Sequence, residues 1–305
     1  MILKAQSKWG WLIAAYLFLA GMGAGAYVAG IVADWAGQGW STIAQIGVCL
    51  GFPSVLIGCG FLILDLGSPK NFWRAGMKPG TSWIARGTLI ISIFMILGAI
   101  HAGLWLWPFN FLGEASSLRH ALGILGAIFA CGTMIYTGIL LGASRPIAFW
   151  STAMLPLLFM VSALSTGVMA VILIASITGS PKEQMLTLNR TDILLILLEF
   201  FVLGLYLQAT HRVPESRASA RLVLMGSAAP LFWLGVVVIG LLVPLGVEVF
   251  STFAGAESHT GSVLAIIIAS ICGLFGGLSL RQVVLSGGIH APLRAGRFEY
   301  ALTNP

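Results

Sequence analysis

Long apolar stretches alternate with short polar segments along the whole chain of 305 residues. The hydrocarbon core of a bilayer, roughly 30 Å thick, is crossed by a helix of about 20 apolar residues. On this measure we expect helices at 11–33, 43–66, 83–106, 118–141, 152–174, 191–207, 230–249 and 263–285. The segments between them leave no room for a soluble domain. The pattern therefore predicts an all-α integral membrane protein with about eight transmembrane helices.

The composition favours the same class of protein. Hydrophobic residues make up 58% of the chain, charged residues 9%, and the mean hydropathy is +0.97, whereas an ordinary soluble domain carries roughly 25% charge. The apolar run from Trp11 to Val32 is too long for the core of a secretory signal peptide, so we expect it to be the first transmembrane helix. The net charge of +6 comes from scattered basic residues, which argues against nucleic-acid binding.

Side chains that could hold a metal or a haem are few and dispersed. All four cysteines lie inside apolar runs and none belongs to a C-x-x-C motif: Cys49, Cys59, Cys131 and Cys272. Iron–sulfur clusters need clustered thiolates, so we expect none in this chain. Among the five histidines, only His101 and His120 share a depth inside the membrane, which suffices for at most one haem. We therefore expect neither haem nor metal in this chain.

An even number of helices places both termini on one side of the membrane, which we call side A; the other is side B. Side B carries only Arg119, Lys182 and Arg190. Side A carries the larger set, Lys4, Lys8, Lys70, Arg74, Lys78, Arg145, Arg212, Arg217, Arg221, Arg281, Arg294 and Arg297. The positive-inside rule then predicts that side A, with both termini, is cytoplasmic. A basic docking surface for a partner protein would produce the same bias.

Four polar side chains fall at a similar depth near side A, each on a different one of the first four helices: Tyr16, Asp65, Arg86 and Tyr136. Opposite charges inside the membrane are costly and mark a candidate site. An alternative for the charged pair is a structural ion pair, and for the tyrosines it is anchoring at the interface. A quinone pocket would use all four, because tyrosines donate to carbonyls, a carboxylate exchanges protons and an arginine keeps it ionised.

A second set of polar groups lies in the last four helices. Glu199 falls in the middle of the sixth expected helix, Ser165 and Thr166 in the fifth, and Arg281 near the end of the eighth. An intramembrane acid is a functional candidate by default, so we treat these four as a candidate proton path. The alternatives are a protonated acid bonded to a neighbouring helix, and hydroxyl groups that bond their own backbone.

Short motifs across the first five expected helices resemble the NrfD/PsrC-type membrane subunits, the polysulfide-reductase NrfD family. They keep the order and spacing of that family, while the last three helices match only in number and character. The matching pieces are Tyr16-Leu-Phe-Leu-Ala-Gly-Met-Gly-Ala-Gly25, Leu64-Asp-Leu-Gly-Ser-Pro69, Phe72-Trp73, Ser82-Trp83, Arg86-Gly87, Tyr136-Thr-Gly138, Ser144-Arg-Pro146, Phe149-Trp150, Leu155-Pro-Leu-Leu-Phe159 and Ser162-Ala-Leu-Ser-Thr-Gly167.

The resemblance implies two four-helix bundles, 1–142 and 143–305, and no haem or metal in this chain. It implies a quinone site in the first bundle, near the face that docks an iron–sulfur subunit. Tyr136 matches the family's tyrosine on the fourth helix, whereas Tyr16 stands where the polysulfide-reductase member has a histidine. Asp65 and Arg86 match recurring positions. Many relatives face their catalytic partners to the periplasm, while the charge count here places the site side in the cytoplasm.

Residues and resemblance together predict a quinone-reactive membrane anchor in the bacterial or archaeal inner membrane. It would exchange electrons between a ferredoxin-like multi-cluster iron–sulfur subunit and menaquinone or ubiquinone, with a molybdenum–pterin catalytic subunit beyond. The chain itself would be non-catalytic or would hold only the quinone site. A proton- or solute-coupled transporter is the alternative from another class, motivated by Glu199 and Arg281. A purely structural anchor is the third.

Overall fold

The computed structural model describes residues 6, 9–66, 69–77, 80, 82–106, 116–143, 147–211, 214–253, 259–290, 293–295 and 298–300. In this part of the chain, eight spans are long and apolar enough to cross a membrane. They are α1 (Trp11–Trp35), α2 (Ser41–Asp65), α3 (Trp83–Trp105), α5 (Ser116–Gly142), α6 (Met154–Thr178), α7 (Lys182–Thr210), η3 (Leu231–Leu242) continued by α9 (Val243–Phe253), and α10 (His259–Ser286). The predicted all-α membrane class and the number of helices are confirmed.

Local chemistry fixes several helix ends. The Ser82 side chain accepts a hydrogen bond from the Ala85 amide and so caps the start of α3. Gly179 ends α6 in the left-handed conformation (φ +73°), which a side chain would disfavour. The seventh span begins as the π-helix η3, and Pro244, just past its end, has no amide hydrogen to donate to the helix ladder.

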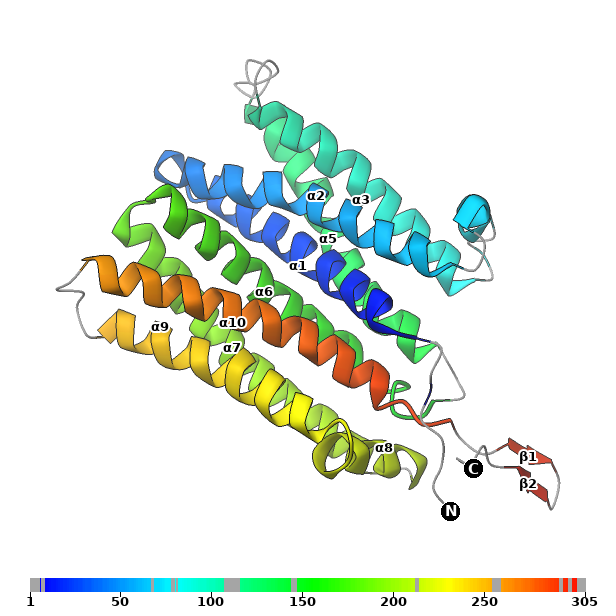
Figure 1. Cartoon of the computed structure of the whole chain (residues 1–305). Coiled ribbons are helices and arrows are strands. Elements are labelled where there is room, and N and C mark those ends of the chain that lie inside the picture. The colour runs from blue at the N-terminus through cyan, green and yellow to red at the C-terminus, as the bar shows by residue number, and fades with distance from the viewer. Residues whose placement is uncertain are drawn as a thin grey trace.

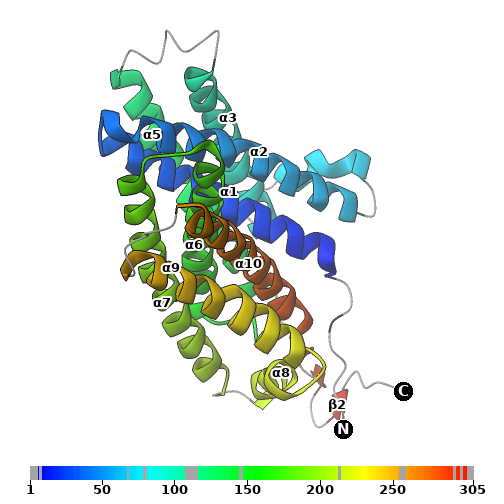
Figure 2. The ribbon, with the colours of Figure 1, turned by 60° about the vertical axis from the view of Figure 1, so that its left-hand side comes forward.

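Successive spans run antiparallel, and the end of α10 lies at the same end of the molecule as the start of α1 (Figure 1). α1 and α6 are the most buried spans. They pack against each other at the centre, with α2, α3 and α5 on one side and α7, α9 and α10 on the other (Figure 2). Any Cβ at Gly167 of α6 would overlap the backbone of Gly25 and Ala26 of α1. The small residues of α1 therefore serve close helix packing.

Large apolar side chains cover the outside of this assembly, where lipid would surround it. Examples that are at least 60% exposed are Leu64, Ile96, Ile128, Leu194, Phe201 and Leu234. In water such a surface would cause aggregation, whereas in hydrocarbon it carries no cost. A lipid bilayer is therefore the environment that this surface fits.

The structure corrects one helix boundary and adds short elements that the sequence did not predict. α7 begins at Lys182, well before the predicted start at 191, because polar residues continue the helix beyond the apolar core. A short helix at side A, α8 (Pro214–Met225), and two 3₁₀ turns, η1 (Gln38–Trp40) and η2 (Pro69–Gly76), were not expected. Near the C-terminus β1 (Leu293–Ala295) pairs antiparallel with β2 (Phe298–Tyr300). The division into bundles 1–142 and 143–305 stays a prediction, since α6 contacts α1 and α5 as well as α7 and α10.

Some residues used above lie outside the described part of the chain. Among the basic residues of side A these are Lys4, Lys8, Lys78, Arg145, Arg212 and Arg297. Among the motif residues they are Gly67, Ser68 and 144–146. The orientation argument therefore remains a sequence-based prediction.

Candidate functional site

Two tyrosines from different helices meet in the side-A half of α1–α5. Tyr16 of α1 is 1% exposed and Tyr136 of α5 is 5% exposed. The Tyr16 hydroxyl is close enough to Tyr136 and Cys59 to interact with both electrostatically. Neither tyrosine hydroxyl has a hydrogen-bond partner among the residues that the structure describes. Buried tyrosine hydroxyls normally find a partner, so this pair offers two hydrogen-bond donors to a ligand.

Glycine on α3 sets the position of Tyr136. The Tyr136 ring lies against Gly87, and a Cβ at that position would overlap the ring. Gly87 directly follows Arg86 in the first turns of α3. Tyr136 therefore lies next to the start of α3, and Tyr16 is close enough to interact with it there.

The two charged residues of this set lie at its side-A edge. Asp65 is the last residue of α2 and is half-buried, while Arg86 is exposed. Arg86 Nη2 donates to the Gly80 carbonyl at 2.9 Å, and its guanidinium lies 4.7 Å from the centre of the Trp83 ring. Within the described residues no ion pair joins Asp65 to Arg86. The structural ion pair considered from the sequence is thus not formed here, and both charges remain near the aqueous side.

The candidate proton-path residues do come together, in the core of α6–α10. Arg281 is 1% exposed, and its Nη1 donates to Ser162 Oγ at 2.5 Å and to the Gly277 carbonyl at 2.9 Å. Glu199, which is 4% exposed, interacts electrostatically with both Ser162 and Arg281. Arg281 is therefore an internal counter-charge to Glu199 and does not belong to the basic surface of side A.

A small cavity of about 10 Å³ touches Glu199, Ser165 and Thr166. Its other walls come from the π-helix η3 and the glycine-rich face of α10, and π-helical turns often mark functional sites. The volume has room for about one water molecule. Thr166 donates to the Ser162 carbonyl at 2.7 Å, the local bond expected of a helical threonine. Ser165 instead donates to a second acid, Asp192 Oδ1, at 2.8 Å.

Sequence reasoning missed Asp192 and Glu248 as site residues. They are 0% and 1% exposed, and their carboxyl groups are close enough to interact with each other between α7 and α9. The predicted α7 started at 191, which put Asp192 at a helix end and in the headgroup region. A usable signal was present, because Asp192 lies seven residues, or two helical turns, before Glu199 and hence on the same face.

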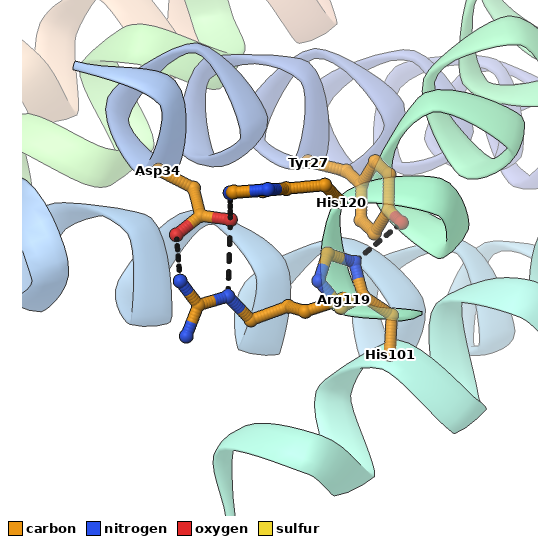
Figure 3. A network of polar contacts seen from close by, with 5 residues as sticks. All are labelled: Tyr27, Asp34, His101, Arg119 and His120. Atoms are coloured by element: carbon orange, nitrogen blue, oxygen red, sulfur yellow. Dashed lines mark hydrogen bonds and ion pairs between the residues drawn. The ribbon is translucent and has the colours of Figure 1, made fainter. Parts of the chain in front are cut away.

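A second missed network joins α1, α3 and α5 at side B, as Figure 3 shows. Asp34 pairs with Arg119 through Nη2 to Oδ1 at 3.1 Å and Nε to Oδ2 at 3.2 Å. His120 Nε2 approaches the same carboxylate at 3.7 Å. Nearby, the Tyr27 hydroxyl and His101 Nδ1 are 2.7 Å apart. The network connects three helices through polar contacts that are buried or partly buried, so we assign it to stabilising their packing.

The fold and these sites define a multi-pass membrane protein with buried tyrosines and acids. The family model described as "Polysulphide reductase, NrfD" matches residues 3–292, and the chain belongs to this family. It is therefore a membrane subunit of the oxidoreductase class, as predicted from its motifs.

Three relatives match along most of their length. The sequence is 30% identical to a polysulfide reductase chain of Wolinella succinogenes, over 92% of this protein and 94% of that one. It is 27% identical to protein NrfD of Escherichia coli, with the same coverage. It is 24% identical to a selenate reductase subunit of Mesobacillus selenatarsenatis, over 88% of this protein and 73% of that one.

Proposed function

We propose that this chain is a quinone-reactive membrane anchor that exchanges electrons between an iron–sulfur subunit and the menaquinone or ubiquinone pool. The observation that carries the proposal is the Tyr16–Tyr136 pair, two buried side chains whose hydroxyls have no protein partner in the described residues. A quinone headgroup presents two carbonyl acceptors and takes up two protons on reduction. Phenol hydroxyls can donate to such a carbonyl and relay a proton.

Each residue of the site has a distinct role in this proposal. Tyr136, fixed on Gly87, donates to one quinone carbonyl. Tyr16 donates from the opposite helix, and the two hydroxyls orient the headgroup between α1 and α5. Asp65 and Arg86 lie at the side-A edge, where we assign the carboxylate to proton exchange with water and the guanidinium, bonded to the Gly80 carbonyl, to holding the start of α3.

Side A is the proposed docking face for redox partners. The relatives are named as parts of polysulfide and selenate reductases, which supports a multi-subunit oxidoreductase here. Trp73, Met77 and Trp83 are exposed beside the proposed quinone site and offer apolar anchors for a partner. We propose a ferredoxin-like multi-cluster iron–sulfur subunit at this face, with a molybdenum–pterin catalytic subunit beyond it.

The distribution of basic residues indicates which face of the protein lies in the cytoplasm. The excess of basic residues at the side-A end supports a cytoplasmic location for this side in the inner membrane of a bacterium or archaeon. The docking face and both termini would then be cytoplasmic. Labelling of single cysteines introduced at Lys70 and at Lys182 by an impermeant thiol reagent tests this, because only one of the two should react in intact cells.

Replacement of Tyr136 by Phe tests the quinone site. General acid–base groups contribute roughly 10²–10⁴-fold to rates, and we expect Tyr136→Phe to lower quinone turnover at least about tenfold. The matched control is Tyr206→Phe on α7, which removes a hydroxyl from an equally buried tyrosine that donates to the Phe149 carbonyl and is not part of the proposed site. Both variants should assemble with the partner subunits. Wild-type turnover in an assembled Tyr136→Phe complex would remove Tyr136 from the site.

A second activity, proton transfer through α6–α10, is favoured by the cavity beside Glu199. Arg281, Ser162 and Glu199 form a continuous hydrogen-bonded and electrostatic chain, and the cavity continues it to Ser165 and Thr166. Buried ionisable groups that face a helix-bundle interior mark proton relays in membrane proteins. We propose that this chain moves protons during quinone turnover. The same groups would serve a proton-coupled transporter, which predicts proton movement without quinone.

A further inference from the structure

The cavity beside Glu199 leads to a pair of acids on the side-B half of the same helices. The Ser165 hydroxyl, which lines the cavity, donates to Asp192 Oδ1 at 2.8 Å. The Asp192 carboxyl group in turn lies close enough to that of Glu248 for the two to interact. Because Asp192 and Glu199 are two turns apart on α7, roughly 10 Å along the axis, they need an intermediary. The cavity and the Ser165 hydroxyl provide one.

The two acids cannot both be charged. An ionised carboxylate only accepts hydrogen bonds, so a carboxyl–carboxyl hydrogen bond needs a proton on one partner. Two carboxylates that share a buried site also repel each other, which favours one proton on the pair. No ion pair joins either acid to a basic side chain within the described residues, and the electrostatic partner of Arg281 is Glu199.

In the described part of the chain, the neighbours of the pair for which contacts are known are polar and uncharged, apart from Glu199. α6 contributes Ser165, and α7 contributes Asn189 one turn before Asp192. α9 contributes Ser251, which accepts from Asn189 Nδ2 at 3.4 Å and donates to the Glu248 carbonyl at 3.0 Å. Asp192 Oδ2 and Glu248 Oε2 are buried and have no partner among the described residues. These atoms leave acceptor positions open for a second proton.

We propose that Asp192 and Glu248 share one proton and form the side-B step of the path that begins at Glu199, an inference that rests on the proton-transfer activity proposed above. The transfer balances without any redox partner. Glu199 releases its proton to a water in the cavity and remains as a carboxylate beside Arg281. The Ser165 oxygen takes a proton from that water while its own proton passes to Asp192. The pair then releases one proton from Glu248 toward side B.

The test uses the complete complex in sealed liposomes, with electron transfer and proton movement recorded together. The variants are Asp192→Asn and Glu248→Gln, in which an amide keeps the hydrogen bond but cannot carry the proton. The matched control is Glu183→Gln, which neutralises an exposed acid in the first turn of α7. We expect each pair variant to lower the proton movement per electron at least about tenfold. Turnover with the membrane made proton-permeable should stay within about twofold of wild type.

Infrared difference spectra give a second readout. With one shared proton, wild type should show a single protonated-carboxyl band for the pair, each single variant should keep one band at a shifted position, and the double variant should lose the band. Two separate bands, one lost in each variant, would mean two fixed protons and would overturn the proposal. A sodium-dependent turnover that is lost in Asp192→Asn would assign the pair to a metal cation and would also overturn it.

Glu199→Gln distinguishes a failure of the Asp192–Glu248 step from a failure of the proposed proton-transfer activity as a whole. If Glu199→Gln stops proton movement while both pair variants retain it, the path exists but does not use Asp192 and Glu248, and only this inference fails. If wild type moves no protons beyond those that the quinone consumes, the proton-transfer activity fails, and this inference fails with it. Neither result affects the tyrosine pair and its quinone turnover.

Discussion

The ring of Tyr136 on α5 lies directly against Gly87 on α3, where any other residue would overlap it. This contact places a hydroxyl-bearing ring from the fourth span at the start of the third, beside Arg86. Tyr16 approaches the same region from α1. The proposed quinone site therefore depends on the absence of a side chain at one position of α3.

Gly87→Ala should damage the quinone site while the complex still assembles. Its Cβ would push the Tyr136 ring aside, and overpacking of this kind costs about 1–3 kcal/mol of stability. We expect quinone turnover to fall at least about fivefold, mainly through weaker quinone binding. Gly98→Ala on the same helix is the control, since its Cβ would meet its nearest neighbour, Phe52, at an ordinary 3.5 Å. Equal turnover in the two variants would contradict the role given to Gly87.

Gly167→Ala should disrupt the α1–α6 contact. A Cβ there would overlap the backbone of α1, which cannot move aside as a flexible side chain could. We expect the free energy of unfolding to fall by about 3 kcal/mol, near the upper end of the cost of overpacking a core. The loss should be seen as a lower thermal midpoint or as poor recovery of the complex. Gly204→Ala has open space around its Cβ and should be neutral or stabilising by up to about 1 kcal/mol. A stable Gly167→Ala protein would mean that α1 and α6 are not packed this closely.

Asp34→Asn should destabilise the side-B end of α1, α3 and α5. It leaves the Arg119 guanidinium without its buried carboxylate, but the Arg119 side chain is 25% exposed and partly solvated. We therefore expect the free energy of unfolding to fall by about 1–2 kcal/mol, which is less than the loss for a fully buried ion pair. Asp34→Asn combined with Arg119→Gln should cost less than the sum of the single changes, because the two residues interact. Additive losses in thermal unfolding would show that the ion pair contributes nothing.

Glu199→Gln should abolish proton movement while Ser162 and Arg281 stay in place. The amide keeps a hydrogen-bond partner for Ser162 but removes the titrating group. Proton uptake recorded with a pH-sensitive dye, alongside turnover in a proton-permeable membrane, measures the effect. Unchanged proton movement would leave Glu199 as a structural acid.

The apolar runs were enough to predict the eight spans, because each is long enough to cross a bilayer and few charges interrupt it. Because successive helices alternate in direction, the sequence also predicted that Tyr16 and Tyr136 lie at a similar depth in the membrane. The depth of a residue in the membrane does not tell on which face of its helix it lies. The sequence therefore could not show that Asp65 and Arg86 stay apart at the side-A edge. The pairs Asp192–Glu248 and Asp34–Arg119 join helices distant in sequence, and only the packing brings them together.

The most direct test of the central claim is whether quinone and iron–sulfur clusters exchange electrons through this chain. The tagged chain would be purified gently under anaerobic conditions with its partners, and the iron content and cluster redox state measured after addition of a quinol or quinone analogue. We predict a stoichiometric iron–sulfur protein whose clusters equilibrate with the added quinone in wild type, and at least about tenfold more slowly in Tyr136→Phe. A chain that purifies without iron, or clusters that do not respond to quinone, would contradict the account.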